Sequence, residues 1–175
     1  MNTANKLTLL RVVMIPVFLV LLYQDFAGHL WAALAVFVLA SITDFVDGYV
    51  ARHYNQITDF GKFMDPLADK LLVMSAMAWF VEADWMPAWA FFLVIARELA
   101  VTGLRLVAVE QGRVIAAGKS GKVKTASTMV GICLMLAFPQ PTLRLVCVAV
   151  ILVTTVYSGV EYFVQNKDVL RKGSF

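Results

Sequence analysis

Charged residues are scarce in this chain of 175 residues, and cysteine and histidine are scarcer still. Asp, Glu, Lys and Arg make up 15% of the sequence, whereas soluble domains average about 25%. A disordered chain would need high charge and low hydrophobicity, which is the opposite of what is found. The composition therefore excludes a soluble globular protein and a disordered one.

The few cysteines and histidines carry no recognisable site. Cys133 and Cys147 both lie inside apolar stretches, so they form neither a disulfide framework nor a zinc site. His29 and His53 have no spacing that indicates a catalytic role. The net charge of +3 comes from basic residues that are better sorted by membrane side, so we expect no nucleic acid as a partner.

Apolar residues, in contrast, make up 61% of the chain. At about 20 apolar residues per membrane helix, this is enough for five or six spans. We therefore predict an all-helical, polytopic membrane protein that forms a single domain over residues 1–175. The apolar runs predict six spans, at Leu7–Tyr23, Leu30–Ala51, Gly61–Val81, Pro87–Val109, Val123–Phe138 and Leu143–Phe163.

The links between these spans differ in charge. The links at 25–29 and 82–86 contain no Lys or Arg, the last link contains only Arg144, and the other links hold nearly all the basic residues. The positive-inside rule then places both termini in the cytoplasm, which fits a bacterial inner membrane. All four tryptophans fall near the two links without basic residues, as expected for anchors at the outer interface.

Four aspartates lie close together where the second span ends and the third begins. The segment reads Asp44-x2-Asp47-Gly48-x2-Ala51-Arg52-x8-Gly61-x3-Asp65-x3-Asp69. An ionised carboxylate in a membrane segment is costly, so it needs a partner or a function. Each pair of aspartates has helical spacing and lies along one face. Because a short link makes the two helices antiparallel neighbours, the pairs can converge as an oxygen-rich site for Mg²⁺ or Mn²⁺.

The residues of this segment also have structural alternatives. Gly48 lies one turn after Asp44 and Gly61 one turn before Asp65, where a missing side chain leaves room for a ligand. Gly48 and Ala51 are also small enough to permit close helix packing. The alternative for the aspartates is a set of ion pairs, with Arg52, Lys62 and Lys70.

The segment resembles the signature of the CDP-alcohol phosphatidyltransferases at all eight fixed positions. The resemblance implies that the aspartates hold divalent cations against the diphosphate of a CDP-linked lipid, while an alcohol attacks the lipid-side phosphorus and releases CMP. It also implies a homodimer. By motif position, the metal ligands are Asp44, Asp47, Asp65 and Asp69. Asp69 also resembles the general base, and the nucleotide-binding positions are Gly48, Arg52 and Gly61.

The family leaves the acceptor open among glycerol phosphate, inositol phosphate, serine, choline and phosphatidylglycerol. In the fourth predicted span, Arg97, Val101 and Arg105 follow i, i+4, i+8 spacing, so both arginines share a face and can bind an anion. The adjacent Glu98 is expected to point in a different direction from Arg97. The alternative role for Arg97 is a structural pair with a motif aspartate.

The link after this span adds three lysines at the same cytoplasmic level, in Gly118-Lys119-Ser120-Gly121-Lys122-Val123-Lys124-Thr125. It is not a P-loop, because the glycine spacing does not match and no strand precedes it. Lys124 is the best candidate for a ligand to an acceptor phosphate. The alternative is a basic patch at the membrane surface.

These two segments resemble the branch of the family that makes phosphatidylglycerophosphate. Other stretches share the resemblance, namely Asn5, Thr8 and Arg11 and the string Asp65-Pro66-Leu67-Ala68-Asp69-Lys70. The implied substrates are CDP-diacylglycerol and sn-glycerol 3-phosphate, taken up among membrane lipids. The resemblance places Asn5 and Thr8 with the CDP-lipid, and the acceptor phosphate near Arg97, Arg105 and Lys124.

Two other classes share part of the pattern. A membrane prenyltransferase also uses aspartate-rich helices and Mg²⁺, but the first half of the motif does not fit that class. In a divalent-cation transporter, the aspartates would form a transport site. Such sites usually lie near the membrane midplane, whereas these carboxylates are predicted at helix ends. Dependence on a cytidine nucleotide separates the three classes.

Overall fold

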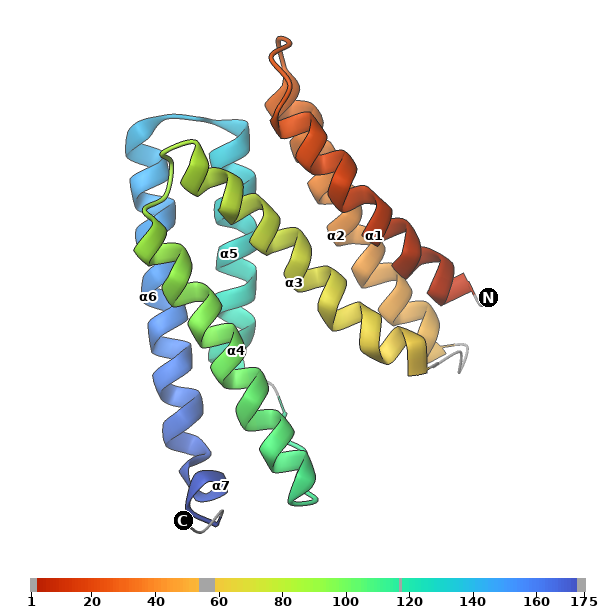
Figure 1. Ribbon diagram of the computed structural model, residues 1–175, viewed down its shortest axis with the longest axis vertical. Helices are drawn as coiled ribbons and strands as arrows, with labels where there is room; N and C mark the ends of the chain where they lie inside the picture. Colours follow the sequence, from red (N-terminus) through yellow and green to blue (C-terminus); the bar gives the residue numbers. More distant parts are fainter. Residues whose placement is uncertain (1–2, 54–58, 117, 173–175) are drawn as a thin grey trace.

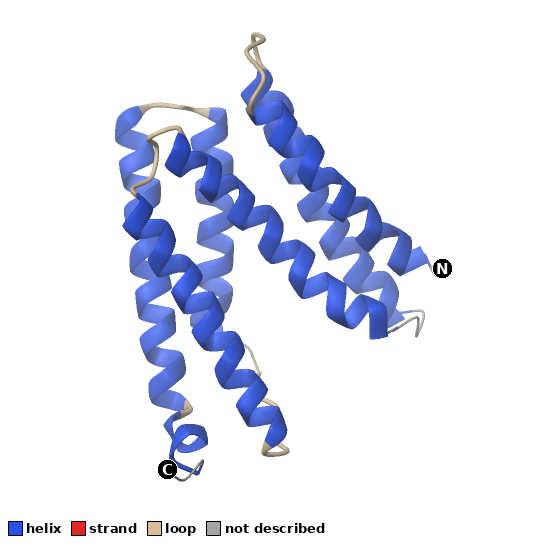
Figure 2. Cartoon of the chain, in the orientation of Figure 1, coloured by secondary structure: helices blue, strands red, loops and turns tan. Residues whose placement is uncertain are grey.

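The computed structural model describes residues 3–53, 59–116 and 118–172, and the side chains of residues 3–7, 44–53, 59–63, 65–66 and 170–172 lie outside that description. Every regular element in the described part is a helix (Figure 2). The long helices are α1 (Thr3–Leu22), α2 (His29–His53), α3 (Asp59–Glu82), α4 (Ala88–Glu110), α5 (Lys119–Ala137) and α6 (Pro141–Gln165), and α7 (Lys167–Lys172) is short. Each predicted span coincides with one long helix to within a few residues, so the all-helical prediction is confirmed.

One predicted boundary was wrong in a way that affects the site. The segment 118–125 was expected to be a link, but α5 already begins at Lys119 with Gly118 as its N-cap residue. Lys124 is therefore held within a helix and is buried. At the start of α4, Pro87 occupies the N-cap position, where its missing N–H costs no intrahelical hydrogen bond.

Figure 1 shows two helical hairpins joined by a crossing helix. α1 packs on α2, and α5 packs on α6, while α4 covers α6. α3 runs between the two groups and contacts α1, α4 and α5. The links at 23–28, 83–87 and 138–140 lie at the upper end of this view, and the C-terminus and the link at 111–116 lie at the lower end. The first half of α3 therefore lies towards the end of the bundle where α4 ends and α5 begins.

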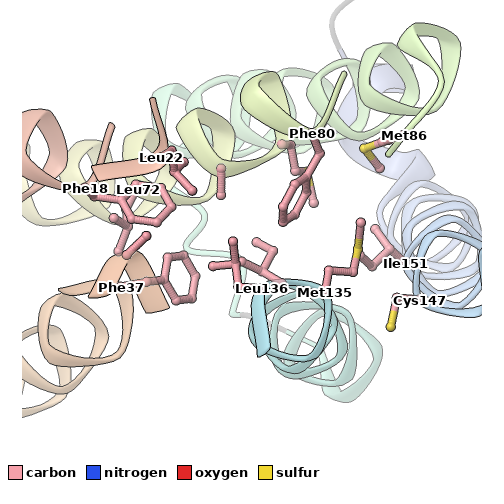
Figure 3. Packing of buried hydrophobic residues seen from close by; sticks show 14 of the residues in the cluster. Phe18, Leu22, Phe37, Leu72, Phe80, Met86, Met135, Leu136, Cys147 and Ile151 are labelled. Carbon is pink, nitrogen blue, oxygen red and sulfur yellow. The ribbon is translucent and has the colours of Figure 1, made fainter. Parts of the chain in front are cut away.

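The core follows α3 along its length. Figure 3 shows side chains from α1, α2, α5 and α6 gathered around Leu72 and Phe80 of that helix. Phe18 and Phe37 pack with their ring centres 5.7 Å apart and join α1 to α2. The same cluster includes buried residues of α5 and α6, among them Met135, Leu136, Cys147 and Ile151. Cys133 and Cys147 are both free thiols, in agreement with the sequence.

Small and hydroxyl-bearing residues bring α5 and α6 close together. A Cβ atom added to Gly131 would lie 3.0 Å from Cδ1 of Ile151, so the Ile151 side chain would have to shift by a few tenths of an ångström to admit it. About one turn away from this contact, the hydroxyls of Ser127 and Thr154 lie 3.0 Å apart. Close backbone approach and interhelical hydroxyl bonds are typical of packing between membrane helices.

The tryptophans divide into two kinds at the upper end of the bundle. Trp31 and Trp89 are exposed. Trp79 and Trp85 pack edge to face with ring centres 5.1 Å apart, and the guanidinium carbon of Arg144 lies 3.6 Å from the ring centre of Trp85. The single arginine of this end is thus placed over an aromatic face, which is a favourable cation–π arrangement.

By length and composition, α6 is the one described helix that is long and apolar enough to cross a membrane, and shorter apolar stretches occupy Thr8–Leu22 and His29–Thr43. α3 and α4 are interrupted by charged residues, including Asp69, Lys70, Arg97 and Glu98. This result does not establish six spans, so that part of the fold prediction remains a prediction.

Candidate active site

A cavity of 810 Å³ lies between α3, α4 and α5, in the half of the bundle where α3 starts and α4 ends. Its polar wall includes Asp69, Arg97, Arg105 and Lys124. Four residues that the sequence singled out for proton transfer and phosphate binding therefore face one space. Its apolar wall comes from Val73, Met74, Val94, Val101 and Met129. The arrangement provides charged groups beside an apolar surface.

Glu98 is the centre of the basic side of this cavity. Its Oε1 accepts one hydrogen bond from Arg97 Nη1 at 2.9 Å and another from Lys124 Nζ at 2.6 Å. Lys124 is buried and the other two are partly buried, with exposed side-chain fractions of 7% for Lys124, 13% for Arg97 and 15% for Glu98. One carboxylate thus fixes two cations from different helices and neutralises part of their charge.

This contact corrects the expectation that Arg97 and Glu98 point in different directions. Adjacent Cα–Cβ bonds do diverge on a helix, but the Arg97 side chain is long enough to bring its guanidinium back to the Glu98 carboxylate. Lys124 approaches from α5 and holds the carboxylate in that position. The counter-ion of Arg97 within the described residues is therefore Glu98, its own neighbour in α4.

Two glycines lie beside the Arg97 side chain, and one of them makes room for it. A Cβ atom at Gly159 of α6 would lie 3.2 Å from Cγ of Arg97, and one at Gly121 of α5 would lie 3.8 Å from Nη2. The first contact is tight enough to displace the arginine stem by a few tenths of an ångström. The absence of a side chain at Gly159 therefore helps to set where the guanidinium lies.

Lys70 joins α3 to α4 next to Asp69. Its Nζ donates a hydrogen bond to Oγ1 of Thr102 at 2.7 Å, and the Thr102 hydroxyl donates to the backbone oxygen of Glu98 at 2.8 Å. An ammonium group has three donors, so this contact uses one of them. Lys70 also lines the cavity, where it adds a further positive charge.

Arg105 is held from α6 and not by Glu98. Its Nε donates a hydrogen bond to the hydroxyl oxygen of Tyr162 at 3.0 Å. The guanidinium carbon also lies 5.5 Å from the centre of the Tyr162 ring. Arg97 and Arg105 were predicted to share one role, but different residues hold them in place.

The rest of the predicted site lies mainly outside the described side chains. The backbones of Asp44, Asp47, Gly48 and Arg52 belong to α2, those of Gly61 and Asp65 to α3, and that of Asn5 to α1, but their side chains are not described. Thr8 and Arg11 are described and buried in α1, and neither lines the cavity. Within the described residues, no group of three or more His, Cys, Asp or Glu side chains comes together.

The backbone nevertheless brings the two halves of the aspartate motif to the same end of the bundle. α2 finishes at His53 and α3 starts at Asp59, and the two ends meet at the right of Figure 1. A model of the CDP-alcohol phosphatidyltransferase family matches residues 1–158. The chain belongs to this family.

Several CDP-alcohol phosphatidyltransferases of bacteria are similar over most of the chain. A Bacillus subtilis protein named CDP-diacylglycerol--glycerol-3-phosphate 3-phosphatidyltransferase is 42% identical, and the alignment covers 97% of each chain. A Mycobacterium tuberculosis protein named probable phosphatidylglycerophosphate synthase is 43% identical over 92% of this chain and 79% of its own length. A Salmonella paratyphi A protein with the same name as the Bacillus protein is 37% identical over 92% of each chain.

Sequence reasoning missed several residues of the site in this family member. Glu98 was considered only as a neighbour of Arg97, and Thr102, Tyr162 and Gly159 were not considered at all. A signal for Glu98 was present, because a carboxylate in the middle of an apolar helix needs a partner. Tyr162 gave no comparable signal, since an aromatic residue near a helix end is ordinary.

The Glu98 cluster leads to a prediction about stability. Glu98→Gln keeps the shape and one acceptor oxygen but removes the charge that Arg97 and Lys124 share. Removing one partner of a buried ion pair typically costs about 3 kcal/mol or more, so we expect the free energy of unfolding in detergent to fall by about 3 kcal/mol. The matched control is Glu110→Gln at the exposed end of the same helix, which should change it by less than about 0.5 kcal/mol. Equal effects of the two changes would contradict the structural role of Glu98.

Proposed function

We propose that this chain transfers the phosphatidyl group of CDP-diacylglycerol to sn-glycerol 3-phosphate, giving phosphatidylglycerophosphate and CMP. The observation that carries the proposal is the single cavity lined by Asp69, Arg97, Arg105 and Lys124. It combines the last aspartate of the family motif with a basic surface suited to a phosphorylated acceptor. The names of the similar bacterial proteins support the same acceptor.

The donor half of the reaction rests on the aspartate motif. Asp44, Asp47, Asp65 and Asp69 would hold Mg²⁺ or Mn²⁺, because carboxylate oxygens are the ligands that these hard cations prefer. When bound, such cations supply charge neutralisation for the diphosphate and for the departing CMP. Gly48, Arg52, Gly61, Asn5 and Thr8 would contact the CDP-lipid. Asp69, which lines the described cavity, would take the proton from the attacking hydroxyl.

The transfer step replaces a phosphoanhydride bond of the donor with a phosphate ester bond to the acceptor. The free hydroxyl oxygen of the acceptor forms a bond to the phosphorus that carries diacylglycerol, while the bond from that phosphorus to the CMP oxygen breaks. CMP leaves with the bonding electron pair, and the hydroxyl proton goes to Asp69. Holding the hydroxyl and the phosphorus in line supplies much of the rate enhancement in reactions of this kind.

The acceptor half rests on the basic wall of the cavity. Arg97, Arg105 and Lys124 would bind the phosphate monoester, and arginine suits this task because its planar fork matches two phosphate oxygens. Among the described residues, Asp69 and Glu98 are the acidic ones that line the cavity beside them, so this part of the wall is cationic on balance. A neutral hydroxyl acceptor would make no charge-assisted contact with these cations, which disfavours it.

We also infer that the protein crosses a bacterial inner membrane six times, with both termini in the cytoplasm, and that it forms a homodimer. Large apolar side chains are exposed on every long helix, including Val13, Leu39, Leu71, Phe92, Val130 and Val153. So much exposed apolar surface is unusual for a soluble monomer and suits contact with lipid. Labelling single cysteines from each side of sealed vesicles tests the topology, and the mass of the detergent-solubilised particle tests the dimer.

The test of the proposed reaction is CMP release by the purified protein with CDP-diacylglycerol and Mg²⁺. We expect release with sn-glycerol 3-phosphate and at least about 100-fold less with glycerol, which has the hydroxyls but not the phosphate. Serine, inositol phosphate and phosphatidylglycerol should also be poor acceptors. Preference for one of these would replace the acceptor and keep the family. No release with any acceptor would contradict the proposed reaction.

A further inference from the structure

The support of Arg105 differs from that of the other basic residues in the cavity. Arg97 and Lys124 share the Glu98 carboxylate, whereas Arg105 donates from Nε to the uncharged hydroxyl of Tyr162. A guanidinium has five N–H donors, one on Nε and four on the terminal nitrogens. The contact with Tyr162 uses the Nε donor, so a two-point contact with phosphate would be made end-on, by one N–H of each terminal nitrogen. Within the described residues, the four terminal donors have no hydrogen-bond partner and stay available.

Tyr162 is itself firmly held. Its exposed fraction is 6%, and it packs with Val101, Leu104 and Ala108 of α4. Its backbone oxygen accepts hydrogen bonds from the backbone nitrogen of Asn166 at 3.2 Å and from Asn166 Nδ2 at 2.7 Å. Burial of the ring and these bonds at the end of α6 fix the position of the hydroxyl group.

The short helix α7 closes this arrangement against α4. Val169 of α7 is buried in the same cluster as Tyr162, and its backbone oxygen accepts a hydrogen bond from Gln111 Nε2 at 3.0 Å. The ring of Tyr162 is thus enclosed by α4, α6 and α7. Arg105 is exposed, and its fixed partner, Tyr162, comes from α6, a helix that does not line the cavity.

We propose that Tyr162 is a positioning residue for the acceptor phosphate, because it fixes Arg105 with its terminal nitrogens available for a phosphate monoester. The identity of that acceptor rests on the proposed function. An exposed arginine loses rotamer entropy when it binds a ligand. A partner that restricts the side chain beforehand reduces this loss and raises the affinity for the ligand. Tyr162 does not touch the substrate in this role and acts through Arg105.

The test is Tyr162→Phe, which removes the hydroxyl and keeps the ring, its burial and its contact with the guanidinium. We expect the KM for sn-glycerol 3-phosphate to rise about fivefold, as for the loss of one ordinary hydrogen bond. The kcat should stay within about twofold, and the KM for CDP-diacylglycerol should not change. The matched control is Tyr157→Phe on the exposed side of the same helix, which should change none of these quantities.

A double-mutant cycle separates positioning from packing. Arg105→Ala should raise the KM for sn-glycerol 3-phosphate more than Tyr162→Phe does. In the Arg105→Ala background, Tyr162→Phe should then have no further effect on that KM. An unchanged KM for sn-glycerol 3-phosphate in Tyr162→Phe alone would overturn the proposal. An equal effect of Tyr162→Phe with and without Arg105 would overturn it too, because the hydroxyl would then act independently of the arginine.

A binding measurement keeps this inference distinguishable from the proposed reaction. The full chain in detergent is titrated with sn-glycerol 3-phosphate and, separately, with inorganic phosphate, without CDP-diacylglycerol. If the unaltered chain releases no CMP with sn-glycerol 3-phosphate, the proposed function fails. The positioning role is still supported if Tyr162→Phe weakens phosphate binding about fivefold relative to Tyr157→Phe. Equal binding by the two variants overturns it.

Discussion

Asp69→Asn is expected to lower the rate of CMP release by about 10³-fold or more, while binding of CDP-diacylglycerol is largely retained. Asparagine has nearly the same shape as aspartate but cannot accept the hydroxyl proton, and general-base catalysis contributes about 10²- to 10⁴-fold in enzymes. Asp69 shares its cavity with Arg97, Arg105 and Lys124. A base in this position lies on the side from which a phosphate-anchored acceptor would present its hydroxyl.

Two measurements decide what Asp69 does. The rate of CMP release is compared with that of Asp168→Asn, an exposed change on α7 that should leave the rate unaltered. Binding of CDP-diacylglycerol is then measured for both variants. Turnover at the normal rate in Asp69→Asn would remove the base assignment. If Asp69→Asn loses both donor binding and turnover, Asp69 mainly holds the cation and the donor.

Removal of divalent cations is expected to abolish CMP release, and Mg²⁺ or Mn²⁺ should restore it. The four aspartates of the motif lie near one end of α2 and in the first half of α3. Carboxylates gathered in this way repel each other unless cations neutralise them, and the diphosphate of the donor adds further negative charge. We therefore expect the loss to reach the background rate, with the chain still folded, because the core around α3 is apolar.

The matched control for this experiment is the same chelator saturated with Mg²⁺ before it is added. It should leave the rate of CMP release unchanged, and the helical circular dichroism signal should be the same in both samples. Full activity after dialysis against free chelator would contradict the metal dependence. Loss of the dichroism signal would assign the cations to folding and not to the reaction.

Much of the architecture could be predicted because the relevant information is local. A run of apolar residues between charged links determines a helix wherever its neighbours lie, so all six long helices were found close to their observed bounds. The error at α5 has a local cause as well. Lys119, Lys122 and Lys124 made its first turns look like a link, but lysine is a good helix former, and Lys124 gains a buried counter-ion.

The family assignment also came from the amino acids alone, since Asp44, Asp47, Asp65 and Asp69 have fixed spacing with two glycines and an arginine. Spacing gives the face of each helix, as it did for Arg97 and Arg105. It gives neither the rotation of one helix against another nor the path of a long side chain. The contacts of Glu98 with Lys124, Lys70 with Thr102 and Arg105 with Tyr162 each join two helices. These contacts depend on how the apolar faces of the helices pack against one another, so only the tertiary structure determines them.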